Sequence, residues 1–176
     1  HDPKRSKKIV TSHNQTELNP RFFNNDNWQT RFQTILRDVD LYENTIQLTN
    51  KGILSPIATG ATAFYKYRIQ DTIQIGGKDY IELHFEGKSK IDLLFYGVLL
   101  ISDDTRFAVQ QATLNIGKTA NINWINDVQI DLSYSEFKNG SMIPVRADLK
   151  MLFGGSKSDV LYGRRETEYL GHRTDS

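Results

Sequence analysis

The sequence predicts a mainly β domain of the α+β class: a curved antiparallel sheet of about seven strands, forming an open half-barrel, with one amphipathic helix packed on it. Three observations lead to this prediction. Apolar and polar residues alternate along most of the chain after residue 62, turn residues separate the alternating runs, and one earlier stretch has helical periodicity instead. Alternation with a period of two is typical of a strand with one buried face.

Length and composition narrow the classes of protein that fit. The 176 residues suit a single domain, and an apolar fraction of 38% is enough for one core. The net charge of +1 argues against a nucleic-acid partner, which would select a basic surface. The chain has no cysteine, so disulfides, thiolate chemistry and cysteine-based zinc sites are excluded. No apolar run reaches the roughly 18 residues of a transmembrane helix.

The two ends of the chain differ from its middle. Residues 1–26 are a polar, irregular lead-in and residues 171–176 a short tail, so we expect a single β-rich domain over residues 27–170. The chain begins at His1, without an initiator methionine or a signal peptide. This beginning is typical of a piece of a longer or processed protein.

A helix is predicted from about residue 27 to residue 40. Five apolar residues there have the spacing of one helical face: Trp28, Phe32, Ile35, Leu36 and Val39. This face would pack on the sheet. In a second interpretation, residues 39–48 are extended, with Tyr42, Ile46 and Leu48 on one side. A loop is expected over residues 50–62, where glycine and proline interrupt regular structure.

The centre of the predicted sheet is a meander over residues 63–116. Its first two alternating runs, residues 63–75 and 80–86, are joined by a Gly-Gly pair that tolerates the positive φ of a two-residue hairpin turn. Between Gln110 and Gln111 the alternation changes parity, which predicts a β-bulge. Because a bulge bends its strand, we expect a curved sheet.

One run of the meander is apolar on both faces. Residues 91–101 carry apolar side chains at odd and even positions, which is typical of a strand covered on both sides. Either a helix or a long loop covers the even side, or an apolar ligand lies there in a groove. The groove would be lined by even-numbered residues of this run, with the helix as a lid: Leu94, Tyr96, Val98 and Leu100, then Trp28, Phe32 and Leu36.

Further hairpins are expected over residues 121–169. Asn139-Gly140 is a strong signal for a hairpin turn between two alternating runs. The last run, residues 160–169, is rich in charge and therefore suits the edge of a sheet.

Few residues suggest chemistry. Glu82, His84 and Glu86 share one strand face, with neighbours about 6.5–7 Å apart, and form a weak candidate set for a metal or for acid–base work. A solvated polar face explains the same pattern and is the favoured interpretation. A hydrolase using Glu82, His84 or Asp103 is the least favoured hypothesis. We expect no catalytic residue, no metal and no cofactor.

Several pieces of the sequence occur as an ordered set. They are Tyr42-Glu43-Asn44-Thr45-Ile46, Ser55-Pro56-Ile57-Ala58, the run of residues 64–69, the run of residues 95–104, and Asn126-Asp127-Val128-Gln129-Ile130. Together, over residues 41–153, they resemble a large Bacteroidetes outer-membrane family of unknown function. Its members have an N-terminal carboxypeptidase-regulatory-like domain, a middle periplasmic region and a C-terminal β-barrel. This chain is similar to the middle region, so it is either an excised segment or a divergent stand-alone protein. The hairpin order is also similar to the lipoprotein-carrier half-barrel.

The resemblance implies a non-enzymatic module on the periplasmic side of the outer membrane of a Gram-negative bacterium. We expect it to bind an acyl chain, a lipoprotein or a partner polypeptide in an apolar groove. The alternative is a purely structural or docking domain whose groove is filled by its own helix. Its partner would then be the β-barrel or the N-terminal domain of the same or another polypeptide. Nucleic acid is not expected, and the oligomeric state is open.

Overall fold

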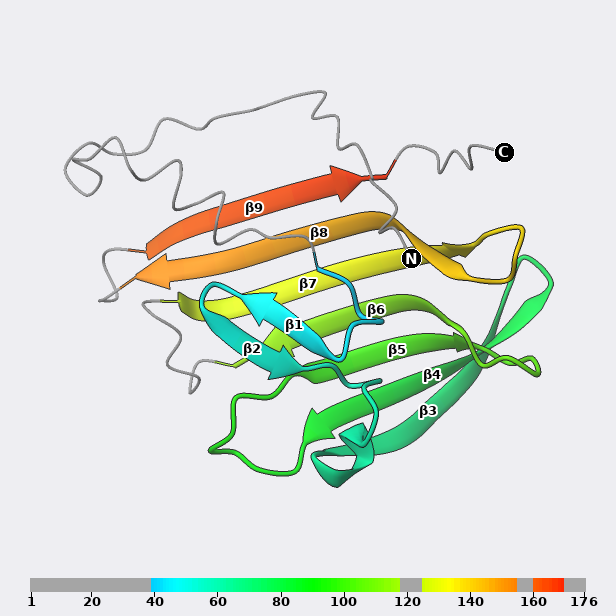
Figure 1. Cartoon of the computed structure of the whole chain (residues 1–176), viewed down its shortest axis with the longest axis horizontal. Coiled ribbons are helices and arrows are strands. Elements are labelled where there is room, and N and C mark those ends of the chain that lie inside the picture. The colour runs from blue at the N-terminus through cyan, green and yellow to red at the C-terminus, as the bar shows by residue number, and fades with distance from the viewer. Residues whose placement is uncertain (1–38, 118–124, 155–159, 170–176) are drawn as a thin grey trace, which may run out of the picture.

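The computed structural model describes residues 39–117, 125–154 and 160–169 (Figure 1). The predicted lead-in and tail lie outside them. The described residues form two antiparallel sheets and a short 3-10 helix, η1 (Ala61–Ala63). The smaller sheet is a hairpin of β1 (Thr45–Leu48) and β2 (Lys51–Leu54). The larger sheet contains β3 (Tyr65–Ile75), β4 (Lys78–Gly87), β5 (Tyr96–Ser102), β6 (Val109–Ile116), β7 (Ile125–Glu136), β8 (Met142–Gly154) and β9 (Val160–Glu168).

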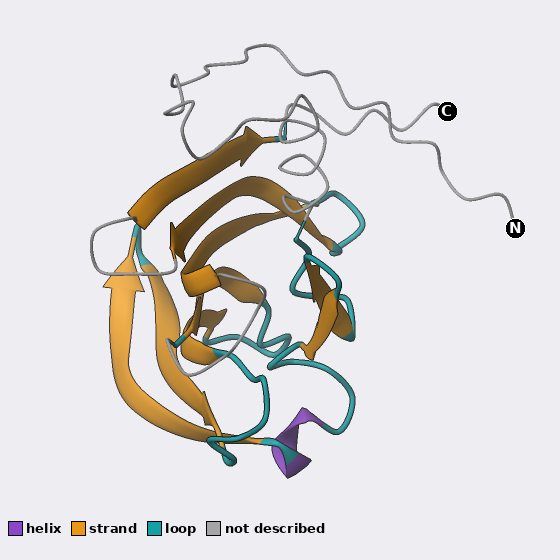
Figure 2. Ribbon diagram, turned by 90° about the vertical axis from the view of Figure 1, so that its left-hand side faces the viewer, coloured by secondary structure: helices purple, strands orange, loops and turns teal. Residues whose placement is uncertain are grey.

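Each strand of the larger sheet pairs antiparallel with the strand that follows it in sequence, so its spatial order runs from β3 to β9 without a crossover. The sheet is open, because β3 and β9 each have a neighbour on one side only within the described residues. Figure 2 shows that the sheet curves strongly around the β1–β2 hairpin. The predicted mainly β fold, with a curved and open antiparallel sheet, is confirmed.

Glycine residues allow the hairpin turns between β3 and β4 and between β7 and β8. Gly76 and Gly77 join β3 to β4 with φ angles of 57° and 76°, in the left-handed region that side chains disfavour. Gly140, between β7 and β8, has a φ of 81°. Both hairpin turns were predicted from these residues, and both are confirmed.

Extra residues in four strands bend the sheet. In β6, Gln111 pairs with Leu100 and Val109 pairs with Ile101, which leaves Gln110 as the extra residue of a bulge. The bulge predicted at this position is therefore confirmed. The strand registers leave one extra residue at three further places: Gln70 in β3, Asn126 in β7 and Val145 in β8. Because a bulge increases local twist, these four account for the curvature.

The core lies between the concave face of the larger sheet and the β1–β2 hairpin. Three hairpin side chains, Ile46, Leu48 and Ile53, are at most 1% exposed. The middle strands of the sheet supply the other side of the core, from one face: Leu99, Leu114, Ile116, Val128, Ile130, Leu132, Leu149 and Met151. Burying this apolar surface on both layers is the main stabilising contribution to the fold.

The structure corrects the prediction of an α-helix packed on the sheet. Residues 27–38 lie outside the described residues, while Val39 and Asp40, at the predicted end of the helix, are described and are not helical. The described residues contain no α-helix, and the layer on the sheet is the β1–β2 hairpin. The alternative extended interpretation is right for Thr45–Leu48, but β2 was missed inside the predicted loop. The turn between β1 and β2 needs a positive φ at Thr49 (56°), which the sequence does not signal.

The structure also corrects the prediction that residues 91–101 form one strand covered on both faces. Only Tyr96–Ser102 is a strand, and residues 91–95 form a loop in which Ile91 is 97% exposed and Phe95 is fully buried. The convex side of β5 is not covered by a second layer at Tyr96, which is 46% exposed. The apolar run therefore consists of two parts: a loop that places Phe95 in the core, and the strand β5.

Candidate functional site

Two tyrosines of β3 hold the covering segment against the concave face. The Tyr65 hydroxyl donates to the carbonyl oxygen of Leu54 at 2.6 Å and accepts from the amide of Phe95 at 3.2 Å. The Tyr67 hydroxyl donates to the carbonyl oxygen of Pro56 at 2.7 Å. Leu54 is the last residue of β2 and Pro56 follows it closely, so the β1–β2 hairpin is fixed at this end.

A third tyrosine fixes the other end of the cover. The Tyr134 hydroxyl, from β7, accepts from the amide of Leu41 at 2.8 Å and donates to Asp40 Oδ1 at 3.1 Å. Its ring packs edge-on against Tyr42, with ring centroids 5.2 Å apart. The Tyr42 hydroxyl in turn accepts from the amide of Val109 at 3.1 Å. The segment before β1 is thereby joined to β6 and β7.

Burial determines the ionisation of these hydroxyls. Desolvation raises the pKa of Tyr65 to about 12, although the hydrogen bond from the Phe95 amide acts in the opposite direction. Desolvation also raises the pKa of Tyr134, and the nearby Asp40 carboxylate adds to this effect. Both side chains therefore remain neutral at physiological pH and keep the O–H that each donates.

The cover leaves little free space on the part of the concave face beneath Val39. A hollow there is lined by Val39 and by side chains of β7, β8 and β9, among them Ile130, Leu149 and Arg165. It has room for about one water molecule. An acyl chain does not fit in it.

The far end of the concave face is open instead. Figure 1 shows the β1–β2 hairpin lying over the middle strands, whereas the ends of β3 and β4 near their connecting turn extend beyond it. Four apolar side chains of the concave face remain partly or largely exposed there: Ile69, Ile81, Leu83 and Ile101. Ile69 is opposite Leu83 and Ile81 is opposite Ile101, so the four are neighbours. We call them the open patch.

The predicted groove residues do not line a common space. Leu94 is partly buried against the core. Tyr96, Val98 and Leu100 project from the convex face, where Val98 is opposite His84. Leu100 is 9% exposed because neighbouring convex side chains surround it. The predicted lid residues lie outside the described residues: Trp28, Phe32 and Leu36.

The weak metal candidates separate into two pairs. His84 Nε2 lies 2.7 Å from Glu82 Oε1, and both side chains are about one-third exposed. Glu86 instead pairs with Lys66 at 2.9 Å, and this contact lowers the pKa of the Glu86 carboxyl. Within the described ranges, no three histidine, aspartate or glutamate side chains are arranged to hold a metal ion.

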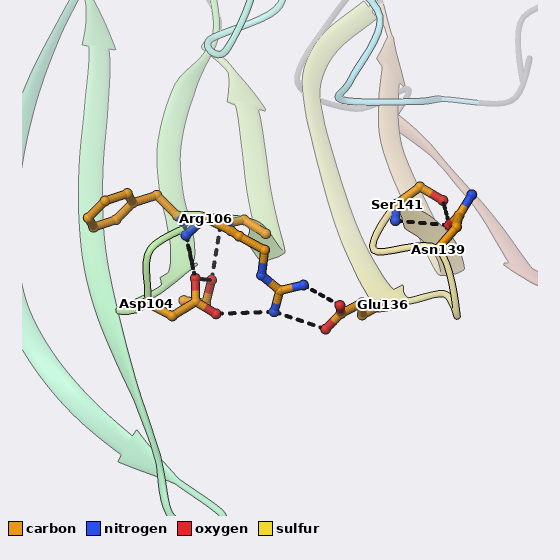
Figure 3. Close-up of polar contacts among 8 residues, drawn as sticks. Asp104, Arg106, Glu136, Asn139 and Ser141 are labelled. Carbon is orange, nitrogen blue, oxygen red and sulfur yellow. Dashed lines mark hydrogen bonds and ion pairs between the residues drawn. The ribbon is translucent and has the colours of Figure 1, made fainter.

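The turn after β5 contains Asp103, which makes no hydrogen bond or ion pair with Glu82 or His84 in the described part of the chain. Its neighbour Arg106 connects this turn to the end of β7, as Figure 3 shows. Arg106 Nη2 donates to Glu136 Oε2 at 3.0 Å, and Nη1 donates to Glu136 Oε1. The guanidinium lowers the pKa of the Glu136 carboxyl.

Asp104 orders the same turn from within. Its Oδ2 accepts from Arg106 at 3.2 Å, and its Oδ1 accepts from the amides of Arg106 and Phe107 at 2.9 and 3.2 Å. Phe107, in the same turn, has a φ of 49° and is 60% exposed. Asp104 therefore maintains the shape of this turn.

The convex face largely satisfies its own charges. The Asp148 carboxylate is 6% exposed and accepts two hydrogen bonds from Arg164, at 2.8 and 2.7 Å. These contacts lower the pKa of Asp148. Lys150 Nζ lies 3.0 Å from Asp131 on the adjacent strand. Exposed apolar side chains lie on both faces, among them Ile75 and Tyr96 on the convex face and Ile69 on the concave face.

Sequence reasoning missed both the tyrosine anchors and the open patch. Alternation correctly places these residues on the buried face, but it gives no information about how far a covering layer extends along that face. β3 and β4 are longer than β1 and β2 by several residues, but this difference could not serve as a signal because β2 itself was not predicted.

Comparison with known families supplies the affiliation. A model described as a family of unknown function, DUF5686, matches residues 5–162, which include β1 to β8 and the first three residues of β9. The chain belongs to the DUF5686 family. This confirms the coarser part of the expected resemblance, a family of unknown function. Comparisons of the DUF5686 chain with curated proteins and with solved structures found no match. None of its described helical segments has the length and hydropathy of a membrane-crossing helix.

Proposed function

We propose that this DUF5686 domain is a non-enzymatic docking module on the periplasmic side of the outer membrane of a Gram-negative bacterium, and that its open patch binds an apolar segment of a partner polypeptide. The observation that carries the proposal is the open patch. Its four adjacent side chains are accessible at the end of a concave face whose middle is filled by the chain's own hairpin. Contiguous exposed apolar surface beside a core is typical of interaction sites.

The shape of the patch favours a polypeptide over an acyl chain. Ligand pockets enclose most of the surface of a small apolar ligand, and burial contributes about 0.8 kcal/mol for each CH₂ that is removed from water. The open patch is a surface that continues to the edge of β3, which is unpaired within the described residues and where Thr72 and Gln74 are exposed on the same concave face. A polypeptide can bury the apolar side chains and also pair with these polar groups.

The proposed location has separate support, namely the sequence pieces that resemble the Bacteroidetes outer-membrane family. In that family the middle region lies between a carboxypeptidase-regulatory-like domain and a β-barrel. Those two parts, and lipoproteins of the same envelope, are therefore the first partners to test. The alternative of a self-filled structural domain is retained in a changed form, because a hairpin occupies the position expected for the helix.

Photo-crosslinking tests which molecule occupies the patch. The crosslinking amino acid p-benzoylphenylalanine is placed at Leu83 in the open patch and, in a control, at Val98 on the convex face. Both variants are expressed in the native host, and mass spectrometry identifies the adducts. We expect one envelope polypeptide crosslinked at position 83, lost when Ile81→Asp is added, and no such adduct at position 98. A lipid-sized adduct at either position, or a polypeptide only at position 98, contradicts the proposal.

Binding of the purified partner gives the quantitative test. Leu83→Asp should weaken the affinity measured by titration calorimetry by about tenfold or more, since it places a charge in the contact. Val98→Asp, equally half-buried, should leave the affinity unchanged. Thermal melting of both variants controls for folding. Native mass spectrometry before and after organic extraction tests the lipid alternative, and an extractable lipid-sized mass would support it over the docking proposal.

A further inference from the structure

β3 is a long and accessible sheet edge. Its 11 residues pair with β4 on one side and with no strand on the other within the described part of the chain. All of them except Tyr65, Tyr67 and Ile73 are exposed. Natural sheets usually protect such an edge, because its outward N–H and C=O groups can pair with another strand. Here the edge carries Ile69, which is 65% exposed.

The bulge in β3 restricts how this edge can pair with a second copy of itself. Before Gln70 the odd-numbered side chains lie on the concave face, and after it the even-numbered ones do, because the register with β4 shifts there. Opposed residues of an antiparallel pair lie on the same face of a sheet. An odd-numbered residue before the bulge in one copy must therefore face an even-numbered residue that follows the bulge in the other copy.

Charge selects one register among those that remain. Arg68 and Asp71 both lie on the convex face, on either side of the bulge. Arg68 contributes to the lowered pKa of Glu86 and Asp71 Oδ1 accepts from the Thr72 amide at 2.8 Å, but within the described residues neither has an oppositely charged atom within 4 Å. Two-fold pairing can place each Arg68 opposite the partner's Asp71, which forms the same ion pair twice. The same register brings Ile69 of both copies to the two-fold axis.

We propose that two copies of this chain pair antiparallel through their β3 edges, with Arg68 of each opposite the partner's Asp71. Tyr67 then faces the partner's Thr72, and Lys66 faces the partner's Ile73. The pairing extends two seven-stranded sheets into one, and Ile69, which faces the partner's Gln70, lies diagonally beside the partner's Ile69 on the concave face. It places both open patches on the same face, on either side of the axis. The pairing does not depend on the docking function.

Charge reversal tests the pairing. Sedimentation velocity of the full chain over a range of concentrations measures the dimer dissociation constant. Arg68→Asp opposes like charges at two places and should raise this constant about tenfold or more. The double variant Arg68→Asp/Asp71→Arg restores opposite charges and should restore dimerisation. Because both residues are exposed, the melting temperature of the dilute protein should change little, which separates loss of pairing from loss of folding.

Introduced cysteines test the register. The chain has no cysteine of its own, so any disulfide comes from the introduced pair. Lys66→Cys/Ile73→Cys should form a covalent dimer on oxidation, because residue 66 faces the partner's residue 73. These two positions lie roughly 20 Å apart within one strand, which excludes an internal disulfide. The single variant Lys66→Cys should not crosslink, because the two copies of residue 66 lie at opposite ends of the pairing.

Three results would overturn the proposal: a wild-type chain that stays monomeric up to millimolar concentration, an Arg68→Asp variant that dimerises like the wild type, or crosslinking by Lys66→Cys alone. Leu83→Asp separates the two proposals, since it should weaken docking at the open patch by about tenfold or more and leave dimerisation intact. Arg68→Asp should do the reverse.

Discussion

Single hydroxyl groups determine how the cover is attached to the sheet. Tyr134 is 5% exposed, and its hydroxyl serves the amide of Leu41 and the carboxylate of Asp40 at once. A buried N–H without a partner loses its hydration and gains nothing in return. The hydroxyl therefore contributes more to stability than its few atoms suggest.

Tyr134→Phe should lower the free energy of unfolding by about 1–3 kcal/mol, because it leaves the Leu41 amide without its acceptor in the interior. Urea denaturation at neutral pH measures this loss. Tyr96→Phe is the matched control, since the Tyr96 side chain is 46% exposed, and its effect should stay within about 0.5 kcal/mol. Equal stabilities of the two variants would show that the Tyr134 hydroxyl does not anchor the cover.

The same hydroxyl should make stability depend on alkaline pH. Burial raises the pKa of Tyr134 in the folded state, while the unfolded chain ionises near pH 10. The stabilisation is therefore fully present below about pH 10 and is lost as the pH rises above it, because only the unfolded state then releases the proton. Tyr65, with a pKa of about 12, acts in the same direction.

The measurement compares urea midpoints at about pH 8 and pH 11. The wild type should lose more stability between these pH values than Tyr134→Phe does. An identical loss in both proteins would contradict the assignment of the raised pKa to this burial.

For single residues, the sequence predicted which side chains are buried better than it predicted which atoms they contact. Alternation placed Tyr65, Tyr67 and Tyr134 on the apolar parity, and all three do face the core. Their hydrogen-bond partners were not predictable, because Leu54, Pro56 and Leu41 belong to a segment whose position depends on tertiary packing.

Among the strands, the pairing of β5 with β6 depends on one missing side chain. A Cβ at Gly97 would lie 1.8 Å from the carbonyl oxygen of Thr113, which is backbone of the adjacent strand. The two strands approach so closely there that only glycine fits. Gly97 was not singled out in the sequence, since an isolated glycine in a strand has several explanations.

Gly97→Ala should destabilise the protein by about 1–3 kcal/mol or more, because the strands must separate to admit the methyl group. Thermal or urea denaturation measures the change. Gly117→Ala is the control, since its Cβ would meet its nearest neighbour, an atom of the Tyr96 ring, at an ordinary 3.7 Å. A Gly97→Ala variant as stable as the control would mean that the sheet yields easily at this point.

Elements with local signals were predictable, and those defined by distant contacts were not. The Gly76-Gly77 turn and the bulge at Gln110 each follow from one or two residues. The loop of residues 91–95 was mistaken for a strand because it contains Phe95. This side chain is apolar because it inserts into the core, not because it belongs to a strand. β2 was missed because Lys51 and Gly52 weaken its alternation, although Ile53 is fully buried.

Across the whole molecule, protection of the backbone should decrease from the covered strands to the β3 edge. β6, β7 and β8 have hydrogen-bonded neighbours on both sides and contribute buried side chains under the cover, whereas β3 has one neighbour and is mostly exposed. Hydrogen–deuterium exchange in dilute solution should therefore be slowest in β6–β8 and fastest in β3. Equal protection of β3 and β7 in the dilute protein would contradict this gradient.

The open patch belongs to the whole-molecule scale as well, which explains why the sequence did not reveal it. Ile81 and Leu83 have the pattern of core residues, and they are accessible only because the β1–β2 hairpin is shorter than the sheet beneath it. The extent of one layer relative to another is not encoded in either layer alone.

The connection of each strand to the next has a consequence for how the chain folds. Every pairing in the larger sheet closes only a short loop, so the strands can form successively at low entropic cost. The cover is different, because the contact of Leu41 with Tyr134 spans 93 residues. The end of the cover that precedes β1 must therefore wait for β7, whereas the end held by Tyr65 and Tyr67 closes over only 11 residues. During synthesis on a ribosome, the part of the concave face beneath Leu41 would stay exposed until Tyr134 has emerged, and this interval is when a chaperone would be needed.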